Sequence, residues 1–592
     1  MQRKIGSLRS RLHCAAAIPW SGTTLESLGK EGDKYMTQHV WLQSYPAGVP
    51  AEIDTSIYTS LVDLMEERFR KSAGAVAYSF MGQDISYAQT DALSLAFAGY
   101  LQSLGLTKGD RVAVMMPNVP QYPVAVAGIL RAGLVVVYVN PLYTPRELEY
   151  QLKDSGAKAI VIIENFAGTL EKCLAATPVK HVVLCAMGDQ LGLLKGPLVN
   201  YVVRKVKKMV PPFYLPTAVR FNQAVARGAK AAFVPVPCKP DDVAVLQYTG
   251  GTTGVSKGAV LLHRNVIANV LQSEAWNAPA MARIPAGVQP VSVCALPLYH
   301  IFAFTIGMML TLRTGGKLVL IPNPRDIPAV LKELSHHTIH SFPAVNTLFN
   351  ALASHPDFNT VDWSHLKVSV GGGTAVQRAV AKLWFEKTGC PICEGYGLSE
   401  TSPSASCNPV TSTEFTGTIG VPLPGTDFKL LNDEGQEAAP GEPGEIAIKG
   451  PQVMAGYWQR PDETAKVMTS DGFLKTGDIG VVDARGFFKI VDRKKDMILV
   501  SGFNVFPTEL EDVVGQMPGV MECACVGMSD AKSGEAVKLV VVRKDPALTE
   551  AEVRAYCKEN LTGYKQPRVV EFRDDLPKTP VGKVLRRELR DK

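Results

Sequence analysis

One stretch, Tyr248–Gly258, combines residue types that suit the binding of a phosphate group. It reads YTGGTTGVSKG, so four glycines, three threonines, a serine and a lysine follow the apolar run Val243–Leu246. Glycine lets a backbone wrap closely round phosphate oxygens, hydroxyl groups add donors, and lysine adds positive charge. The stretch differs from a Walker A loop, because Lys257 follows Ser256 instead of glycine. On residue types alone, an anion-binding loop and a plain surface turn are equal alternatives.

Further segments of distinctive composition follow this loop along the chain. They are Ala295–Phe304 (ALPLYHIFAF), Gly371–Gly373, Gly395–Pro403 (GYGLSETSP), Thr476–Asp478, Asp492–Pro507 (DRKKDMILVSGFNVFP) and Pro577–Lys583 (PKTPVGK). In this order they resemble the signature motifs of the adenylate-forming enzymes, which include acyl-CoA synthetases, luciferases and peptide-synthetase adenylation domains. The resemblance extends from about residue 36 to the end of the chain. Asn323–Pro328, Phe342–Leu352 and Leu499–Pro507 are most similar to bacterial long-chain fatty acid–CoA ligases.

The resemblance implies a two-step reaction on a carboxylic acid. A carboxylate is a poor electrophile, so one of its oxygens attacks the α-phosphorus of ATP and expels pyrophosphate, which leaves an acyl-adenylate. The thiol of coenzyme A then attacks the carbonyl carbon of the adenylate, and AMP departs. Both steps rely on positioning and on neutralising charge at phosphate oxygens. A long-chain fatty acid, ATP, Mg²⁺ and coenzyme A are therefore the implied substrates and cofactors.

The same resemblance implies which residues bind the nucleotide. Thr249 and Glu400 would hold Mg²⁺, an ion that prefers oxygen ligands. Tyr396 would offer adenine a flat stacking face, and Asp478 would accept hydrogen bonds from the ribose hydroxyls. The expected nucleotide-binding residues are Tyr248, Thr249, Gly250, Gly251, Thr252, Thr253, Gly254, Lys257, Gly371, Gly372, Gly373, Gly395, Tyr396, Gly397, Ser399, Glu400, Asp478, Arg493 and Lys583.

Four residues are implied to act in catalysis: Lys583, Glu400, Thr249 and His300. Lys583 would stabilise the adenylate as it forms, by reaching the carboxylate and phosphate oxygens. His300 would border the acyl carboxylate and the entry of coenzyme A, and the alternative for it is a satisfied core histidine. Val345, Thr347 and Leu348 would line an apolar tunnel for the acyl chain together with His300.

A movement of the C-terminal part is also implied by the resemblance. Asp492 matches the hinge position of the family, about which the C-terminal domain rotates after adenylation. The rotation would withdraw Lys583 and present the loop of Ser501 and Gly502 to the coenzyme A side. One site then serves two reactions, because the mobile domain has two closed arrangements.

The elements that must position these residues show an α/β pattern from about residue 55 onward. Apolar strand-like runs alternate with helical patterns, and this alternation predicts largely parallel sheets. The predicted strands are 111–116, 134–139, 159–163, 181–184 and 317–321, and the predicted helices are 94–104, 145–155 and 328–335.

Two smaller units are predicted after this body. A turn-rich stretch at 432–445 connects two strand-like runs, 427–431 and 446–449, and indicates a β-rich subdomain. Beyond it, strands at 497–500, 521–526 and 537–542 predict a compact α+β domain. Two capping boxes, Thr508 with Glu511 and Thr549 with Glu552, are expected to begin its helices.

Length and composition bound the classes of protein. A chain of 592 residues is too long for one core, and we expect a poorly ordered extension at 1–35, an N-terminal adenylation domain at 36–491 and a mobile C-terminal domain at 492–592. The net charge of +6 is small for this length, so nucleic acid is not expected as a partner. Eleven scattered cysteines are typical of reduced thiols in a cytoplasmic protein.

Contact with a membrane needs separate tests. The uncharged run 284–312 contains three prolines in its first half, which favours buried core over a membrane span. Leu198–Met209 (LVNYVVRKVKKM) is basic and partly amphipathic, so it suits peripheral attachment to the inner face of the membrane and equally a solvated surface helix. A homodimer is a further prediction that the sequence leaves open.

Two alternatives to long-chain acyl-CoA synthesis are considered. The first is the same chemistry on aryl or medium-chain acids. The second is a protein that keeps the fold without catalysis and serves as a fatty-acid binding protein or membrane scaffold. Intact Lys257, Glu400, Asp478 and Lys583 speak against the second alternative.

Overall fold

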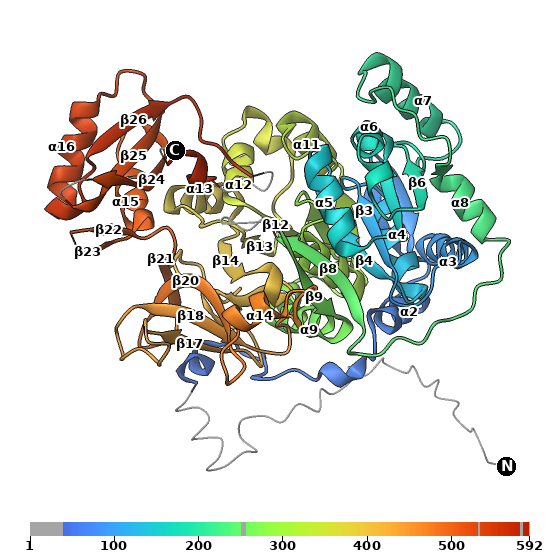
Figure 1. Cartoon of the computed structure of the whole chain (residues 1–592), viewed down its shortest axis with the longest axis horizontal. Coiled ribbons are helices and arrows are strands. Elements are labelled where there is room, and N and C mark those ends of the chain that lie inside the picture. Colours follow the sequence, from blue (N-terminus) through green and yellow to red (C-terminus); the bar gives the residue numbers. More distant parts are fainter. Residues whose placement is uncertain (1–38, 250–255, 502, 531–532, 580–583, 591–592) are drawn as a thin grey trace, which may run out of the picture.

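The computed structural model describes residues 39–249, 256–501, 503–530, 533–579 and 584–590. Two large sheets with surrounding helices form most of this part of the chain, and a smaller domain follows them at one end of the long axis (Figure 1). The predicted class is confirmed: a large N-terminal part with parallel and mixed sheets, a β-rich subdomain and a small α+β C-terminal domain. The extension predicted at 1–35 lies outside the described residues.

The first large sheet carries the predicted phosphate loop. Across the described residues its order is β19-β9-β8-β4-β3-β5-β6-β7. The strands are β3 (Arg111–Met115), β4 (Val135–Tyr138), β5 (Ala159–Ile163), β6 (His181–Cys185), β7 (Val219–Arg220), β8 (Val243–Thr249), β9 (Lys257–Leu262) and β19 (Gly456–Tyr457). Neighbours from β8 to β7 are parallel, whereas β9 and β19 add to one edge in antiparallel fashion. The predicted strands of this sheet are confirmed to within a residue at each end.

The second large sheet carries the predicted adenine frame. Its order over the described residues is β16-β15-β14-β13-β12-β10-β11-β1-β2. The strands are β1 (Val76–Phe80), β2 (Gln83–Ser86), β10 (Val291–Cys294), β11 (Lys317–Leu320), β12 (Ser341–Ala344), β13 (Val368–Gly371), β14 (Ile392–Gly397), β15 (Ser404–Cys407) and β16 (Val421–Pro422). Its central pairs are parallel, and antiparallel pairs close both edges.

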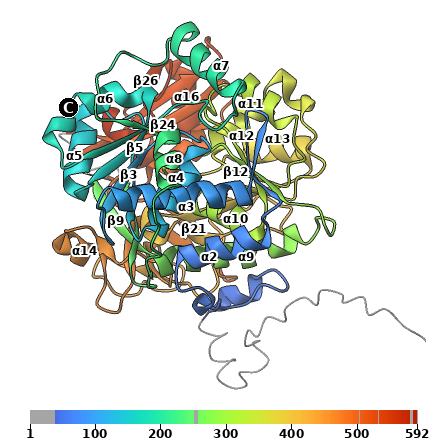
Figure 2. The same ribbon diagram turned by 90° about the vertical axis from the view of Figure 1, so that its right-hand side faces the viewer.

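Helices cover both faces of these sheets. They are α2 (Leu61–Lys71), α3 (Tyr87–Ser103), α4 (Gln121–Arg131), α5 (Pro145–Ser155), α6 (Ala167–Glu171), α7 (Lys195–Tyr201), α8 (Phe221–Gly228), α9 (His263–Met281), α10 (Leu310–Thr314), α11 (Ile327–Leu334), α12 (Asn346–Ala353) and α13 (Arg378–Thr388). Figure 2 shows α2, α3 and α9 lying across the strands at one end of the molecule. Along β3, Val112 and Val114 enter one core while Ala113 and Met115 enter another, as the two-residue period of a strand buried on both faces requires.

Helix α5 illustrates how local sequence fixes an element that was predicted correctly. The Thr144 backbone N–H donates to the Glu147 carboxylate at 2.8 Å, and the Thr144 hydroxyl accepts from the Glu147 N–H at 3.4 Å. Pro145 fits the first turn, and Gly156 ends the helix with a φ of 63°. This capping box and glycine stop mark both ends of the helix in the local sequence.

The β-rich subdomain lies beside the large sheets and below the C-terminal domain in the view of Figure 1. Its strands are β17 (Asp427–Leu431), β18 (Gly444–Lys449), β20 (Leu474–Val482) and β21 (Phe488–Arg493), all antiparallel, with α14 (Pro461–Val467) between β19 and β20. The prediction of a small β-rich unit around the turn-rich stretch is confirmed. Its last strand, β21, leads directly to the predicted hinge.

The C-terminal domain packs helices on one mixed sheet. Its strands are β22 (Ile498–Val500), β23 (Phe503–Val505), β24 (Val520–Asp530), β25 (Gly534–Arg543) and β26 (Val569–Arg573), and its helices are α15 (Pro507–Val514) and α16 (Glu550–Asn560). The capping box predicted for Thr549 and Glu552 is confirmed at α16.

The capping box predicted for Thr508 and Glu511 is wrong. Helix α15 begins after Phe506, whose side chain makes no capping bond. The Thr508 N–H donates instead to the Asp492 carboxylate at 2.9 Å, and the Glu511 carboxylate pairs with Arg586 at 2.6 Å. Partners distant in sequence therefore win over the local cap.

No helix in the described part of the chain is long and apolar enough to cross a bilayer. The uncharged run 284–312 forms β10, a buried π-helical stretch at Ala303–Met309 and most of α10, which confirms the prediction of buried core. The basic stretch predicted as a helix over 198–209 is α7 (Lys195–Tyr201) continued by a π-helical stretch at Val202–Val206.

Candidate active site

The predicted phosphate loop joins two paired strands. At the base of this hairpin Thr249 of β8 pairs with Lys257 of β9, and the Ser256 hydroxyl donates to the Thr249 carbonyl at 2.7 Å. The loop residues Gly250, Gly251, Thr252, Thr253 and Gly254 lie outside the described residues. The structure thus places the two residues that flank the loop.

Tyr248 braces the base of the loop from the opposite side. Its hydroxyl donates to Asp154 at 2.7 Å, and Asp154 also pairs with Arg460 at 2.7 Å. Burial raises the pKa of the Tyr248 hydroxyl, so it stays a donor. The side chain of Tyr248 is committed to this contact inside the protein.

Glu400 lies in a short 3₁₀ turn, Ser399–Thr401, that contacts both β8 and β9. Its Oε1 accepts a hydrogen bond from the Tyr457 hydroxyl at 2.8 Å. Burial raises the pKa of the Glu400 carboxyl, and the hydrogen bond from Tyr457 and the charge of Lys257 oppose that rise. The predicted pair Thr249 and Glu400 is therefore brought to one end of the first sheet.

Lys257 faces the same place from β9. Its ammonium forms an ion pair with Glu463 of α14 and lies 5.1 Å from the centre of the Tyr457 ring. Neither Glu463 nor Tyr457 was predicted from the sequence, because neither belongs to a segment with phosphate-binding composition.

The predicted adenine frame lies at the ends of β13 and β14. Gly371 ends β13 and pairs with Glu394 of β14, and a β-carbon at Gly371 would come within 2.5 Å of Val376. Gly372 lies against the ring of Phe302, and Gly373 adopts a φ of 78°. A β-carbon at Gly371 or Gly372 would crowd these neighbours, and the positive φ of Gly373 favours glycine, so all three positions suit glycine.

The residues after the glycines continue along β14. Gly395 and Tyr396 pair with β15, and a β-carbon at Gly397 would lie 1.8 Å from the Pro403 carbonyl, so only glycine fits there. Ser399 is half-buried at the start of the turn that carries Glu400.

Asp478 of β20 links the β-rich subdomain to the second large sheet. It accepts a hydrogen bond from the Tyr396 hydroxyl at 2.6 Å and pairs with Arg493 at 3.1 Å, and it is only 3% exposed. Burial raises the pKa of the Tyr396 hydroxyl, which therefore remains protonated. Three residues predicted separately for ribose and adenine thus form one hydrogen-bonded group.

The predicted acyl-side residues divide into two kinds. Val345 and Leu348 are buried in the core that both large sheets share, at 9% and 7% exposed, whereas Thr347 is exposed. A β-carbon built at Gly373 would lie 3.7 Å from Val345. The residues predicted for the acyl chain and for adenine are therefore neighbours at this point. His300 is half-buried, and its Nδ1 accepts from the Phe302 N–H at 3.3 Å.

The predicted hinge residue pairs with Ile479 of β20 in the β-rich subdomain and contacts α15 of the C-terminal domain. Asp492 is 1% exposed and accepts hydrogen bonds from the N–H groups of Arg493 at 2.6 Å and Thr508 at 2.9 Å. Ser501 is exposed with a φ of 52°, and its N–H donates to the Ser533 carbonyl at 2.8 Å. Gly502 and Lys583 lie outside the described residues.

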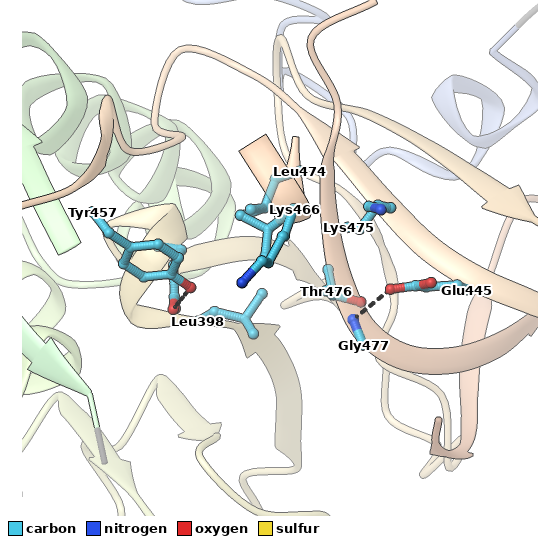
Figure 3. A pocket seen from close by; sticks show the side chains of 10 residues that line it. Leu398, Glu445, Tyr457, Lys466, Leu474, Lys475, Thr476 and Gly477 are labelled. Carbon is cyan, nitrogen blue, oxygen red and sulfur yellow. Dashed lines mark hydrogen bonds between the residues drawn. The ribbon is translucent and has the colours of Figure 1, made fainter. Parts of the chain in front are cut away.

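A cavity of about 220 Å³ opens beside Glu400 (Figure 3). Tyr457 and Glu400 form one wall, and the Gly477 N–H, which donates to Glu445 at 3.0 Å, lies on the opposite wall next to Asp478. The lining residues are Leu398, Glu400, Glu445, Tyr457, Lys466, Val467, Leu474, Lys475, Thr476 and Gly477. Two lysines, Lys466 and Lys475, and two carboxylates, Glu400 and Glu445, are among these residues and suit a charged ligand. Neither lysine was predicted from the sequence.

Comparison with known proteins agrees with this arrangement. The sequence pattern of the AMP-binding enzyme family matches residues 65–458, and that of the AMP-binding enzyme C-terminal domain matches residues 509–583. The chain belongs to the AMP-binding enzyme family.

Individual relatives cover almost the whole chain. A long-chain-fatty-acid–CoA ligase from Escherichia coli O157:H7 is 54% identical over 93% of this chain and 98% of its own length. A feruloyl-CoA synthase from Amycolatopsis sp. is 33% identical over 88% and 97%. The crystal structure of ATP-bound MatB from Rhodopseudomonas palustris superposes with a TM-score of 0.77 at 30% identity, covering 89% of this chain and 98% of that one.

Glu394 generates a prediction about pH. Its Oε2 is buried without a hydrogen-bond partner among the described residues, and burial raises the pKa of its carboxyl to about 8 from the ordinary 4.5. Between these values the folded protein holds a proton that the unfolded chain has released. The free energy of unfolding should therefore fall as pH rises, by up to about 1.4 kcal/mol per pH unit.

Glu394→Gln should remove this slope, leaving stability nearly unchanged at pH 5 and higher than wild type at pH 8. Urea unfolding at pH 5, 6.5 and 8 measures the effect. The control is Glu386→Gln at a carboxyl that is 57% exposed, which should follow the wild-type profile. Parallel profiles for Glu394→Gln and wild type would show that Glu394 is ionised in the folded protein.

Proposed function

We propose that this protein is a long-chain fatty acid–CoA ligase, which converts a fatty acid, ATP and coenzyme A to acyl-CoA, AMP and pyrophosphate through an acyl-adenylate. The observation that carries the substrate class is 54% identity to a long-chain-fatty-acid–CoA ligase over 98% of that protein. The identity to a feruloyl-CoA synthase is 33%, which favours a fatty acid over an aryl acid.

The nucleotide site supports adenylation. Asp478, held by Tyr396 and Arg493, presents carboxylate oxygens that suit ribose hydroxyls, and the ring of Tyr396 suits adenine. Gly371 ends β13, which pairs with β14, the strand that carries Tyr396. ATP would therefore lie with its base at β13 and β14 and its phosphates toward Thr249 and Lys257.

Magnesium fits the residues at the phosphate end. The Glu400 carboxylate and the Thr249 hydroxyl are hard oxygen donors, and Mg²⁺ commonly takes one or two carboxylates together with substrate phosphates. When bound, the ion would neutralise charge on the phosphate oxygens. Thr249 and Glu400 would hold it, and Lys257 would add positive charge beside it.

The acyl chain would lie next to the adenine frame. Val345 and Leu348 are apolar and buried, and Val345 lies next to Gly373, which suits a fatty acid whose carboxylate meets the α-phosphate. His300 would border that carboxylate. Thr347 is exposed and does not share their burial.

In the second half-reaction, a different set of residues would surround the adenylate. We place Lys583 in the first step and the loop of Ser501 and Gly502 in the second, with rotation about Asp492 between them. Asp492 suits a hinge, since its backbone pairs with Ile479 of the β-rich subdomain and its carboxylate accepts from the Thr508 N–H of the C-terminal domain. Boundaries at residues 491 and 492 and a homodimer stay predictions.

Peripheral attachment to the cytoplasmic face of the membrane is supported by one surface, the α7 surface, defined as residues 193–209. Its apolar side chains are strongly exposed: Leu193 95%, Leu194 90%, Leu198 62%, Tyr201 60%, Val206 64% and Met209 50%. Lys205, Lys207 and Lys208 are exposed among them, whereas Arg204 is held inward by Glu164 at 2.7 Å. Apolar side chains interleaved with lysines suit an anionic bilayer.

The acid specificity is tested by turnover of palmitate, octanoate and coumarate at matched concentrations. Palmitate should give the highest kcat/KM, because the buried apolar residues near Gly373 favour a long alkyl chain. Formation of acyl-CoA and release of pyrophosphate are both measured. Preference for coumarate would overturn the substrate class, and a folded protein that releases no pyrophosphate with any acid would favour a non-catalytic binding protein.

Lys583→Ala should lower adenylation at least about 100-fold, because a charge aimed at the developing adenylate is lost. Formation of the thioester from supplied palmitoyl-AMP should stay within about threefold of wild type. The matched control is Lys578→Ala in the same motif, whose ammonium pairs with Glu522 at 2.7 Å and Asp575 at 2.9 Å. Equal loss of both half-reactions in Lys583→Ala would contradict a role in one step.

The α7 surface is tested by cosedimentation with vesicles of phosphatidylcholine and phosphatidylglycerol. Replacing Leu193 and Leu194 by Ser should weaken binding about 100-fold or more, because each buried leucine contributes about 1.5–3 kcal/mol. Leu142→Ser, at a leucine that is 57% exposed elsewhere, is the control and should bind as wild type does. Unchanged binding of the double variant would place any membrane contact elsewhere.

A further inference from the structure

The segment Met454–Trp458 connects the two charged parts of the site through its backbone. The Trp458 N–H donates to the Gly258 carbonyl at 2.7 Å, next to the end of the phosphate loop. The Met454 N–H donates to the Glu400 carbonyl at 2.8 Å. Five consecutive residues therefore tie the strand that carries Lys257 to the turn that carries Glu400.

The Tyr457 side chain repeats this connection with its two chemically different parts. Its hydroxyl donates to Oε1 of Glu400 at 2.8 Å, and the centre of its ring lies 5.1 Å from the ammonium of Lys257. A hydrogen bond to a carboxylate is among the stronger ones in proteins, and a cation within 6 Å of a ring face is attracted to it. One residue thus contacts a cation and an anion that approach it from different elements.

Tyr457 is itself held firmly. Tyr457 lies in the edge strand β19 and pairs with Ala259 of β9. Its N–H donates to the Thr464 hydroxyl of α14 at 2.8 Å. The preceding Gly456 has a φ of 143°, and a β-carbon there would come within 2.9 Å of Thr464. The close approach of β19 to α14 therefore fixes the position of the Tyr457 backbone, from which the ring extends.

Helix α14 supplies the remaining partner of Lys257. Glu463 lies one residue before Thr464 and pairs with both Lys257 and Lys466. The ammonium of Lys257 is thus enclosed by the Tyr457 ring and the Glu463 carboxylate, both positioned by the same short segment. An incoming phosphate can replace Glu463 as its anionic partner while the ring contact stays in place.

We propose that Tyr457 is a positioning residue that fixes the ammonium of Lys257 and the carboxylate of Glu400 relative to each other, so that phosphate groups and a divalent cation meet a preformed pair. The proposal rests on the proposed function, since the roles of Lys257 and Glu400 come from it. The oxygen of Glu400 that faces away from Tyr457 is the one left for a cation. Partners that orient a metal ligand in this way commonly change metal affinity 10–100-fold when they are removed.

Two variants separate the two contacts. Tyr457→Phe removes the hydroxyl and keeps the ring, whereas Tyr457→Leu removes both. The control is Tyr45→Phe, which removes a tyrosine hydroxyl that donates to the Pro422 carbonyl at 2.6 Å, away from the site. All are made in the full chain.

Three equilibrium measurements read the outcome without turnover. Binding of Mn²⁺ to the protein with ATP is measured by electron paramagnetic resonance of the free ion, and binding of ATP and of AMP by calorimetry. Tyr457→Phe should raise the Mn²⁺ dissociation constant about tenfold and leave AMP binding unchanged. Tyr457→Leu should in addition weaken ATP binding about fivefold, because Lys257 loses its ring contact, while AMP binding again stays unchanged.

Two results would overturn the proposal. The first is wild-type Mn²⁺ and ATP binding in Tyr457→Phe and Tyr457→Leu. The second is weakening of AMP binding to the same extent as ATP binding, which would mean that Tyr457 supports only the fold. If Tyr457→Leu does not fold, the Mn²⁺ dissociation constant of Tyr457→Phe is the measurement that tests the proposal. Failure of the proposed function would be seen separately, as absence of palmitate-dependent pyrophosphate release in the wild type.

Discussion

Strand β9 hydrogen-bonds with β8 on one side and with β19 on the other, and the candidate site depends on this double pairing. Thr249 and Lys257 face each other across the first pair, and Ala259 and Tyr457 across the second. Lys257 thereby meets Glu463, which is 206 residues away in the sequence. Without the edge strand β19, nothing would fix the distance between the Lys257 ammonium and the Glu463 carboxylate.

The second sheet contributes a different kind of order. Parallel strands β13 and β14 lie side by side, and glycines at 371 and 372 let the end of β13 pass close to Val376 and Phe302. Asp478 arrives there from the β-rich subdomain and bonds to Tyr396. The candidate residues for binding adenine, ribose and phosphate thus come from three sheets. Hydrogen bonds between side chains connect these sheets at the site.

Much of the fold was predictable because its signals are local. Helix α5 has a capping box and a glycine stop, and buried parallel strands such as β5 are continuous apolar runs. The resemblance of ordered motifs supplied Asp478, Tyr396 and Glu400 as members of one site, which spacing alone does not bring together. Sequence reasoning failed where a distant partner decides: Glu511 pairs with Arg586 instead of capping α15, and Tyr457 and Glu463 acquire their contacts only through β19.

The ion cluster at the end of the chain has a mechanical consequence. Arg586 reaches Glu511 at 2.6 Å and Asp496 at 3.4 Å, and Arg590 reaches Asp496 at 3.1 Å. All four residues follow Asp492, so a rotation about that residue leaves every one of these ion pairs intact. In such a rotation the turn at Arg586–Glu588 would move as one rigid body with the rest of the C-terminal domain, because ion pairs bind it to Glu511 and Asp496.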